Sequence, residues 1–276
     1  MNPTQLSNII ESYDTFLLDA SGVIYNDYGP FEGTVETIQR MQDKGTVFVV
    51  TNNSFQYLDS ISTKLREHNI NIEPNNIISS GQGLALAPDI KKIVADKCIY
   101  IYGSDNSKHY VLDAGAKELT EDITKADVVI MTASYKGDNT EHVEALKQEK
   151  QNRPSLPIIC CNPDKVVLSK RGIKPVVGHY AKVIEELTSS AVHWVGKPQE
   201  NFSYVVRQIL DKYHPNFNPK TTCFFDDNIE NVMRLKKDLN ISGSWVKDTG
   251  IFKDDQVSDL IQKYGTPNYL IPVLAI

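Results

Sequence analysis

The chain has 276 residues, a formal net charge of -6, and 41% hydrophobic and 23% charged residues. This composition is typical of a globular protein, and the length fits one large domain or two of ordinary size. The acidic balance argues against broad nucleic-acid binding, which needs Lys and Arg to neutralise phosphates. No stretch approaches the roughly 20 apolar residues that span a bilayer. Because residues 1–13 are polar and do not resemble a signal peptide, we expect a cytoplasmic protein without a membrane partner.

Short apolar runs recur along the chain, and each ends in polar residues. Continuous apolar runs of this length are typical of strands buried on both faces, as in a parallel sheet. The runs comprise residues 16–18, 47–50, 98–102, 128–131, 158–161, 193–195 and 223–225.

Helical periodicity separates these runs, most clearly over residues 202–213 and 229–239. Strands that alternate with helices predict an α/β fold with a doubly wound, mostly parallel sheet. In such sheets, ligands bind beyond the carboxyl ends of the strands. Four polar residues follow predicted strands, so we expect four strands to bring them to one rim. They are Asp19, Thr51, Lys197 and Asp227.

These residue types match the requirements of phosphate-ester hydrolysis. A carboxylate can attack phosphorus and form an aspartyl-phosphate, which makes Asp19 the candidate nucleophile. A divalent metal such as magnesium offsets the repulsion between carboxylate and phosphate and takes oxygen ligands, so Asp227, with Asp226 beside it, is the candidate metal site. Lys197 supplies a positive charge, and residues 51–53 supply a hydroxyl and N–H donors for the phosphoryl oxygens.

Four segments in chain order carry a family resemblance. Asp19 to Tyr25, Val50 to Ser54, Gly196 to Pro198 and Phe225 to Asn231 resemble the ordered motifs of the haloacid dehalogenase superfamily. The Thr-Asn-Asn and Gly-Lys-Pro forms, together with Cys161 to Asp164, resemble subclass IIA. That subclass includes sugar-phosphate and nucleotide phosphatases related to p-nitrophenyl phosphatases and pyridoxal phosphate phosphatase.

The resemblance implies a Mg²⁺ site. Asp19 would attack phosphorus and also bind the metal, the backbone carbonyl of Ser21 would be a second ligand, and Asp227 would be a third. Asp226 stands where relatives usually carry glycine, so either carboxylate of the pair is a candidate ligand, and we favour Asp227. Capping of the following helix is the alternative role for the pair.

The resemblance also implies a phosphate site. Thr51 and the N–H groups around Asn52 and Asn53 would bind the phosphoryl oxygens. Lys197 would neutralise charge on Asp19 and on the phosphate. A plain turn is the alternative role for the two asparagines.

In this subclass, a cap domain is inserted between the second and third motifs. We therefore expect a core of residues 1–81 and 191–276 and an inserted α/β cap of residues 82–190 that determines substrate choice. Asn162 and Asp164 lie in this insert. Their turn either helps to present substrate-contacting residues or is purely structural.

Position 21 departs from the family pattern. Phosphatases of the superfamily usually carry a second aspartate there, which protonates the leaving oxygen and later activates water, whereas this chain has Ser21. Loss of such a group lowers rates by about 10²–10⁴-fold. Three explanations stay open: a substrate with a good leaving group, a proton supplied by a cap residue or by the substrate, or a protein that binds a phosphorylated ligand without hydrolysing it.

The leading hypothesis is a magnesium-dependent phosphatase that hydrolyses a small phosphorylated metabolite, of the sugar-phosphate or nucleotide type, through an aspartyl-phosphate on Asp19. The alternative, based on Ser21, is a catalytically weak or inactive phospho-ligand-binding protein of the same fold. A homodimer is expected only by analogy with subclass relatives.

Overall fold

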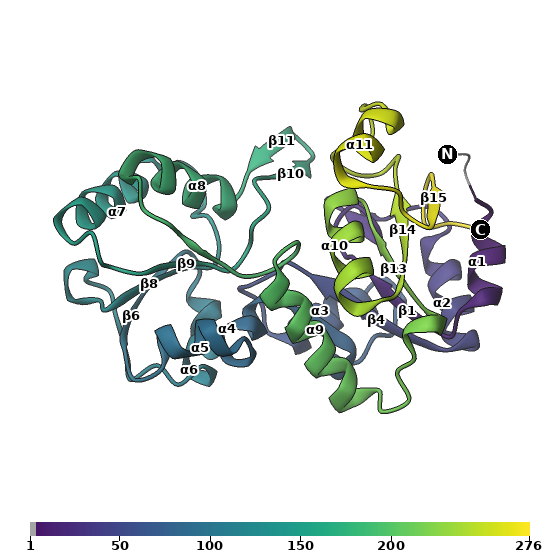
Figure 1. The fold of residues 1–276 in the computed structure, drawn as a ribbon, viewed down its shortest axis with the longest axis horizontal. Coiled ribbons are helices and arrows are strands. Elements are labelled where there is room, and N and C mark those ends of the chain that lie inside the picture. The colour runs from purple at the N-terminus through teal and green to yellow at the C-terminus, as the bar shows by residue number, and fades with distance from the viewer. Residues whose placement is uncertain (1–3) are drawn as a thin grey trace.

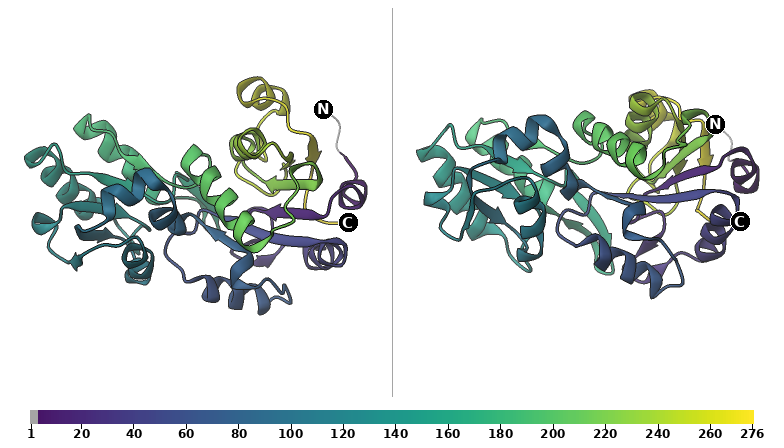
Figure 2. Two further views of the ribbon diagram at one scale, coloured as in Figure 1. Left: turned by 60° about the horizontal axis from the view of Figure 1, so that its bottom comes forward. Right: turned by 90° about the horizontal axis from the view of Figure 1, so that it is seen from below.

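The computed structural model describes residues 4–276. It contains two parallel sheets, one in each of two lobes that lie side by side along the longest axis (Figure 1). The views in Figure 2 show the same division into lobes, with α9 (Glu200–Tyr213) near their junction. The predicted α/β fold, with a doubly wound sheet and a second α/β unit, is therefore confirmed.

The larger sheet has six parallel strands in the order β15-β14-β13-β1-β4-β5. They are β1 (Thr15–Leu18), β4 (Thr46–Thr51), β5 (Ile77–Ser79), β13 (Thr222–Asp226), β14 (Ser242–Val246) and β15 (Tyr269–Ile271). Because β1 pairs with β4 on one side and β13 on the other, residues that follow β1 lie between those that follow its neighbours.

Helices cover both faces of this sheet, as alternation of side chains along β1 requires. Phe16 and Leu18 pack with α1 (Leu6–Ser12), α2 (Thr34–Lys44) and α3 (Leu58–Arg66). Leu17 faces the opposite cluster, which contains α9 and α10 (Ile229–Leu239). The two helices predicted from periodicity correspond to α9 and α10. A further helix, α11 (Val257–Tyr264), packs near β14 and β15.

The smaller sheet has five parallel strands in the order β12-β9-β8-β6-β7. They are β6 (Cys98–Tyr102), β7 (Glu118–Thr120), β8 (Val128–Met131), β9 (Ile158–Cys160) and β12 (His193–Trp194). Its helices are α4 (Gly83–Leu86), α5 (Pro88–Val94), α6 (Lys108–Asp113), α7 (Thr140–Asn152) and α8 (Val177–Thr188). The boundary of the cap at residue 190 stays a proposal. β12 lies beyond that boundary and pairs with β9.

Two antiparallel hairpins complete the fold. The first, β2 (Tyr25–Asn26) with β3 (Gly29–Pro30), belongs to the larger lobe. The second, β10 (Val166–Ser169) with β11 (Gly172–Pro175), extends from the smaller lobe toward the larger one (Figure 1).

One hydrophobic cluster joins the lobes. It contains Phe48 and Val50 of the larger sheet, Val128 and Ile130 of the smaller sheet, and the buried face of α9. Burial of apolar surface in a shared cluster stabilises both lobes at once, in proportion to the area removed from water.

The loop after β4 adds three hydrogen bonds across the junction. Asn52 Nδ2 donates to Asp164 Oδ1 at 3.1 Å, and Ser54 Oγ donates to Thr132 O at 2.6 Å. Tyr110 Oη donates to Gln56 O at 2.8 Å. The loop that carries the predicted phosphate site is therefore also the loop on which the smaller lobe rests.

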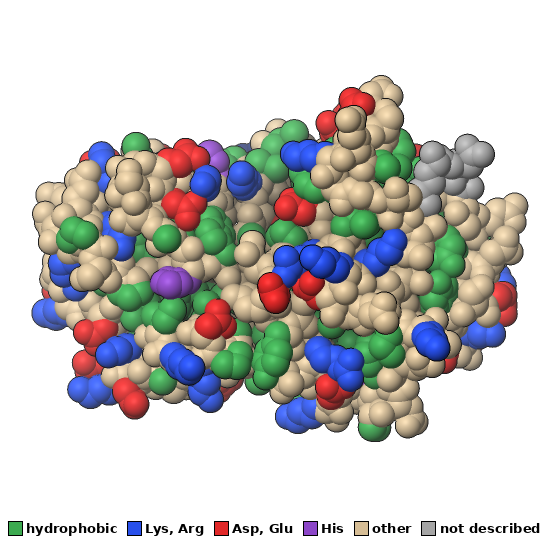
Figure 3. Space-filling model, in the orientation of Figure 1, with side chains coloured by type: hydrophobic (Ala, Val, Ile, Leu, Met, Phe, Trp, Pro, Cys, Tyr) green, Lys and Arg blue, Asp and Glu red, His purple; other side chains and the backbone are tan. Residues whose placement is uncertain are grey.

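Charged side chains are interspersed on the face shown in Figure 3, where Lys and Arg alternate with Asp and Glu. Within residues 4–276, none of the helices combines the length and the apolar character that crossing a bilayer requires.

Substitution of Ser54 tests the junction. Ser54 is 1% exposed, so Ser54→Ala leaves the buried Thr132 carbonyl without this donor and should lower the free energy of unfolding by about 1–3 kcal/mol. Urea denaturation measures the change. Ser12→Ala removes an exposed bond to Asn8 O and should stay within about 0.5 kcal/mol of the unmodified protein. Equal effects of the two changes would contradict the assigned role of Ser54.

Candidate active site

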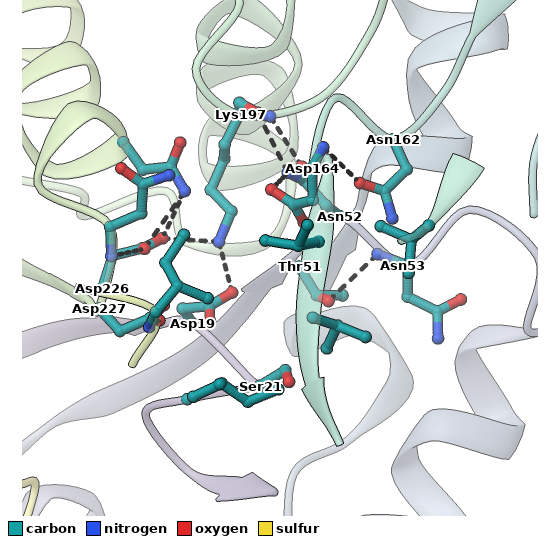
Figure 4. Close-up of a pocket in the computed structure, with 18 of the residues that line it drawn as sticks. Asp19, Ser21, Thr51, Asn52, Asn53, Asn162, Asp164, Lys197, Asp226 and Asp227 are labelled. Carbon is teal, nitrogen blue, oxygen red and sulfur yellow. Dashed lines mark hydrogen bonds and ion pairs between the residues drawn. The ribbon is translucent and has the colours of Figure 1, made fainter. Parts of the chain in front are cut away.

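A cavity of about 210 Å³ lies where the carboxyl ends of β1, β4 and β13 meet the β10–β11 hairpin (Figure 4). Every residue that the sequence singled out for chemistry lines it. These are Asp19, Ser21, Thr51, Asn52, Asn53, Asn162, Asp164, Lys197, Asp226 and Asp227. The close-up shows Asp19 below the Lys197 ammonium and Asp164 on the Asn52 side of the cavity.

Asp19 occupies the centre of the sheet edge. Its backbone N–H donates to Phe225 O at 2.8 Å, which continues the β1–β13 ladder by one residue. Because β1 lies between β13 and β4, Asp19 has the acidic pair on one side and Thr51 on the other. The side chain is buried, with 7% of Asp19 exposed.

Lys197 reaches the cavity from the other lobe. It follows β12, which pairs with β9, so the fourth strand at the rim belongs to the smaller sheet. The residue is 1% exposed, and its ammonium meets Asp19 Oδ1, Asp226 Oδ2 at 2.7 Å and Val50 O at 2.9 Å. Burial opposes the charge, but Asp19 and Asp226 outweigh it and raise the pKa of Lys197 above its ordinary value.

The two neighbouring aspartates have different environments. Asp226 accepts hydrogen bonds from Lys197 Nζ, from Asn228 N at 2.8 Å and from Asn231 Nδ2 at 3.2 and 3.3 Å. Asp227 accepts one from Ile251 N at 3.2 Å on Oδ2, and its Oδ1 has no donor among the described residues. Asp227 therefore keeps an oxygen available to a ligand, whereas Asp226 is occupied by the protein.

The backbone around Asp227 needs glycine. A Cβ added at Gly22 or Gly250 would lie 2.7 or 2.1 Å from Asp227 Oδ2, closer than non-bonded atoms approach.

The alternative role of the aspartate pair as a helix cap is wrong, because Asn228 caps α10 by accepting a hydrogen bond from Glu230 N at 2.9 Å.

Four carboxyl groups surround one ammonium in this region: Asp19, Asp164, Asp226 and Asp227 around Lys197. Burial raises the pKa of Asp19 to about 7 and that of Asp164 to about 6. Burial and the Asp226 charge raise the pKa of Asp227 well above its ordinary value. Burial is the largest cause of all three shifts, and neighbouring carboxylates add to it. With four carboxyl groups and one ammonium, the region also has a deficit of positive charge.

The same deficit suits a divalent cation. Carboxylate oxygens of Asp19, Asp226 and Asp227 lie within 4.8 Å of one another. Hard cations such as Mg²⁺ bind through one or two carboxylates together with phosphate oxygens and waters. Asp19 and Asp227 supply such oxygens, so the residues present fit the metal.

Asn52 connects several parts of the site. Its Oδ1 accepts a hydrogen bond from Lys197 N at 2.7 Å, and its Nδ2 donates to Lys197 O at 3.1 Å and to Asp164 Oδ1 at 3.1 Å. The side chain therefore fixes the backbone of Lys197, and both of its polar atoms are engaged by the protein.

Asn53 stabilises the turn that follows. Its Oδ1 accepts hydrogen bonds from Phe55 N at 3.2 Å and Gln56 N at 3.0 Å, and its Nδ2 donates to Gln56 Oε1 at 2.6 Å. Its own N–H donates to Thr51 Oγ1 at 3.2 Å. The side chain thus has the plain turn role that was the alternative.

The remaining expected residues lie at the cavity wall. Ser21 is exposed there, and no carboxyl group occupies its position. Asn162 Oδ1 accepts a hydrogen bond from Asp164 N at 2.9 Å, so this turn orients Asp164 toward Asn52.

Sequence reasoning missed two features. Asn231 was given no role beyond marking the end of the fourth motif, yet it holds Asp226. The β10–β11 hairpin, which walls the cavity, was not predicted. Its signal was an apolar run, 166–168, followed by Ser169-Lys170-Arg171-Gly172, a pattern that favours a tight turn between strands.

The family model described as haloacid dehalogenase-like hydrolase matches residues 16–117, which include β1 with Asp19 and β4 with Thr51. Over this segment, the chain is similar to haloacid dehalogenase-like hydrolases. The family prediction from the four ordered motifs is confirmed.

Relatives of this hydrolase carry the names of phosphatases. A 4-nitrophenylphosphatase from Schizosaccharomyces pombe is 22% identical over 99% of this chain and 96% of its own length. A structure described as a possible sugar phosphatase from Cytophaga hutchinsonii has 19% identity and a TM-score of 0.86, covering 100% of this chain and 99% of that one. A glycerol phosphate phosphatase from Mycobacterium tuberculosis, solved with magnesium, has 17% identity and a TM-score of 0.77, covering 96% and 77%. At these identities, the solved structures establish a shared fold.

The raised pKa of Asp19 predicts how stability depends on pH in EDTA. Between about pH 4 and about pH 7, the folded state keeps a proton on Asp19 that the unfolded state has lost. The free energy of unfolding should therefore fall as pH rises through this window, with each pKa unit corresponding to about 1.4 kcal/mol. Chemical denaturation across the range measures the fall, which should be smaller in Asp19→Asn. An equal fall in both proteins would contradict the assignment.

Proposed function

We propose that this hydrolase is a magnesium-dependent phosphomonoesterase that acts on a small phosphorylated metabolite through an aspartyl-phosphate on Asp19. The main support is one cavity that combines a buried carboxylate, a buried ammonium and a deficit of positive charge. The phosphatase names of the relatives favour the same reaction class.

Asp19, the backbone carbonyl of Ser21 and Asp227 would hold Mg²⁺. When bound, the metal supplies positive charge that lowers the repulsion between a phosphate and the nucleophile. Asp226 is not assigned as a ligand, because its oxygens already accept hydrogen bonds from Lys197, Asn228 and Asn231. Asp226 instead orients the Lys197 ammonium.

The protein's own residues account for most of the first step. A carboxylate oxygen of Asp19 forms a bond to phosphorus while the ester oxygen leaves with the electron pair of the broken P–O bond. Lys197 favours the ionised form of Asp19, although burial outweighs this effect on its pKa, and it opposes the charge of the phosphoryl group. Thr51 and the backbone N–H groups of residues 52–53 would hold the phosphoryl oxygens, once the Asn53 N–H exchanges its hydrogen bond to Thr51 Oγ1 for one to the phosphate. Water then attacks phosphorus, releases phosphate and restores the Asp19 carboxylate.

The leaving oxygen needs a proton that Ser21 cannot supply near neutral pH. Among the described residues that line the cavity, Asp164 is the carboxyl group from the smaller lobe, and burial raises its pKa to about 6. It therefore supports the explanation in which a cap residue provides the proton. A good leaving group, which needs little protonation, is the other route to turnover.

A second candidate function is binding of a phosphorylated ligand without hydrolysis. Ser21 is the observation that favours it, because the usual general acid–base carboxylate is absent from this position. In that case, phosphorylated compounds bind and no inorganic phosphate appears.

Asp19→Asn tests the nucleophile. The change removes the attacking carboxylate and should lower phosphate release from acetyl phosphate by at least about 10³-fold, measured in the presence of Mg²⁺. Asp43→Asn makes the same chemical change at an exposed position of α2 and should leave the rate unchanged. Undiminished turnover in Asp19→Asn would refute the aspartyl-phosphate mechanism.

Ser21→Asp tests the missing general acid. An aspartate here should raise kcat for an alkyl phosphate, whose leaving oxygen needs a proton, by up to about 10²-fold. Acetyl phosphate has a good leaving group and should gain much less. Ser60→Asp adds the same charge at an exposed position of α3 and serves as control. No phosphate release from any compound, even with Ser21→Asp, would favour the binding function.

A further inference from the structure

Apolar side chains form the outer wall of the cavity. Each is half-buried, so the part that other residues do not cover is available to a ligand. Three belong to the hairpin strand β10 and three to the larger lobe: Val166, Val167, Leu168, Tyr25, Phe55 and Ile251.

The hairpin is held over the cavity by contacts with the larger lobe. At its tip, Lys170 N donates to Asp27 Oδ2 at 3.0 Å, and the Lys170 ammonium lies 5.0 Å from the centre of the Tyr28 ring. Both partners belong to the turn between β2 and β3. The apolar wall is therefore in place before any ligand binds.

The polar side chains around the cavity are largely engaged by the protein. Asn52 and Asn53 use their amides on Lys197, Asp164 and the turn, and Asn228 caps α10. If a substrate with many hydroxyl groups bound here, most of those hydroxyls would lose their hydrogen bonds to water and face apolar side chains. Each hydroxyl left without a partner costs about 1–3 kcal/mol.

The charges of the lining residues add a second restriction. Among the described residues that line the cavity, Lys197 is the one Lys or Arg, and its ammonium already has three acceptors. A second anionic group on the substrate would meet the Asp164 side of the cavity without a cation. The cavity volume of about 210 Å³ is also below the roughly 300–1,000 Å³ of pockets for drug-sized ligands.

We propose that the substrate is a phosphomonoester of a small, uncharged and largely apolar alcohol or phenol, whose organic group lies against β10. This rests on the proposed phosphatase function and narrows it. It excludes sugar phosphates and nucleotides as the preferred class, although one structural relative is described as a possible sugar phosphatase.

A matched pair of esters tests the proposal on the full-length protein with Mg²⁺. Cyclohexylmethyl phosphate and glucose 6-phosphate both carry a six-membered ring and a primary ester oxygen, but only the second has ring hydroxyls. We expect kcat/KM to favour cyclohexylmethyl phosphate by at least about tenfold, the effect of about 1.4 kcal/mol. Equal values, or a preference for glucose 6-phosphate, would overturn the proposal.

Variants of the hairpin test whether the apolar wall causes the preference for cyclohexylmethyl phosphate. Leu168→Asn keeps the side chain at similar size but makes the wall polar. It should reduce the ratio of kcat/KM for cyclohexylmethyl phosphate to that for glucose 6-phosphate several-fold. Ile173→Asn is the matched control: Ile173 is the cross-strand partner of Leu168, is 67% exposed and lies outside the cavity wall. A ratio that changes equally in both variants would contradict a role for the wall.

Calorimetry on Asp19→Asn separates the substrate class from the reaction. Dissociation constants for the two esters are measured without turnover. If acetyl phosphate is not hydrolysed by the unmodified protein but cyclohexylmethyl phosphate still binds at least tenfold more tightly, the phosphatase function fails and the ligand class stands. If turnover occurs and neither kcat/KM nor affinity differs between the esters, the ligand class fails and the phosphatase function stands.

Discussion

Four carboxyl groups around a single ammonium, three of them buried and one half-buried, make up the constraint on which this site depends. Lys197 balances one of the charges of Asp19, Asp164, Asp226 and Asp227. The remaining deficit keeps protons on buried carboxyl groups or attracts a divalent cation. Because the carboxylates repel an anionic phosphate, a phosphate binds here only when a cation is also present. Burial of these charges lowers the stability of the fold, which indicates that the arrangement is kept for function.

The smaller lobe supplies part of this balance. Lys197 follows β12 of the smaller sheet, and Asn52 of the larger lobe holds its backbone on both sides. Asp164 reaches the same amide from the loop after β9. The inserted lobe thus covers the site and also contributes to its electrostatics, which ties the choice of substrate to the geometry of the reacting groups.

Sequence patterns predicted the parts that depend on buried strands. The runs 16–18, 47–50 and 223–225, which precede Asp19, Thr51 and the Asp226–Asp227 pair, are apolar, so their carboxyl ends could be placed at one rim. Other parts depend on pairing, which a sequence does not display. β12 has only two residues, and nothing in His193 and Trp194 indicates which sheet it joins. The engagement of the Asn52 side chain likewise depends on a partner 145 positions away.

The order of these residues along the chain has a consequence for folding during synthesis. Asp19 precedes Lys197 by 178 positions, and β1 precedes its partner β13 by the whole inserted lobe. A nascent chain that ends after β9 and before β12 has β1 with one edge unpaired and the Asp19 carboxyl without its ammonium. The smaller sheet then lacks only β12. The larger sheet therefore closes last, and until then β1 offers an open edge to other chains, the situation in which aggregation competes with folding.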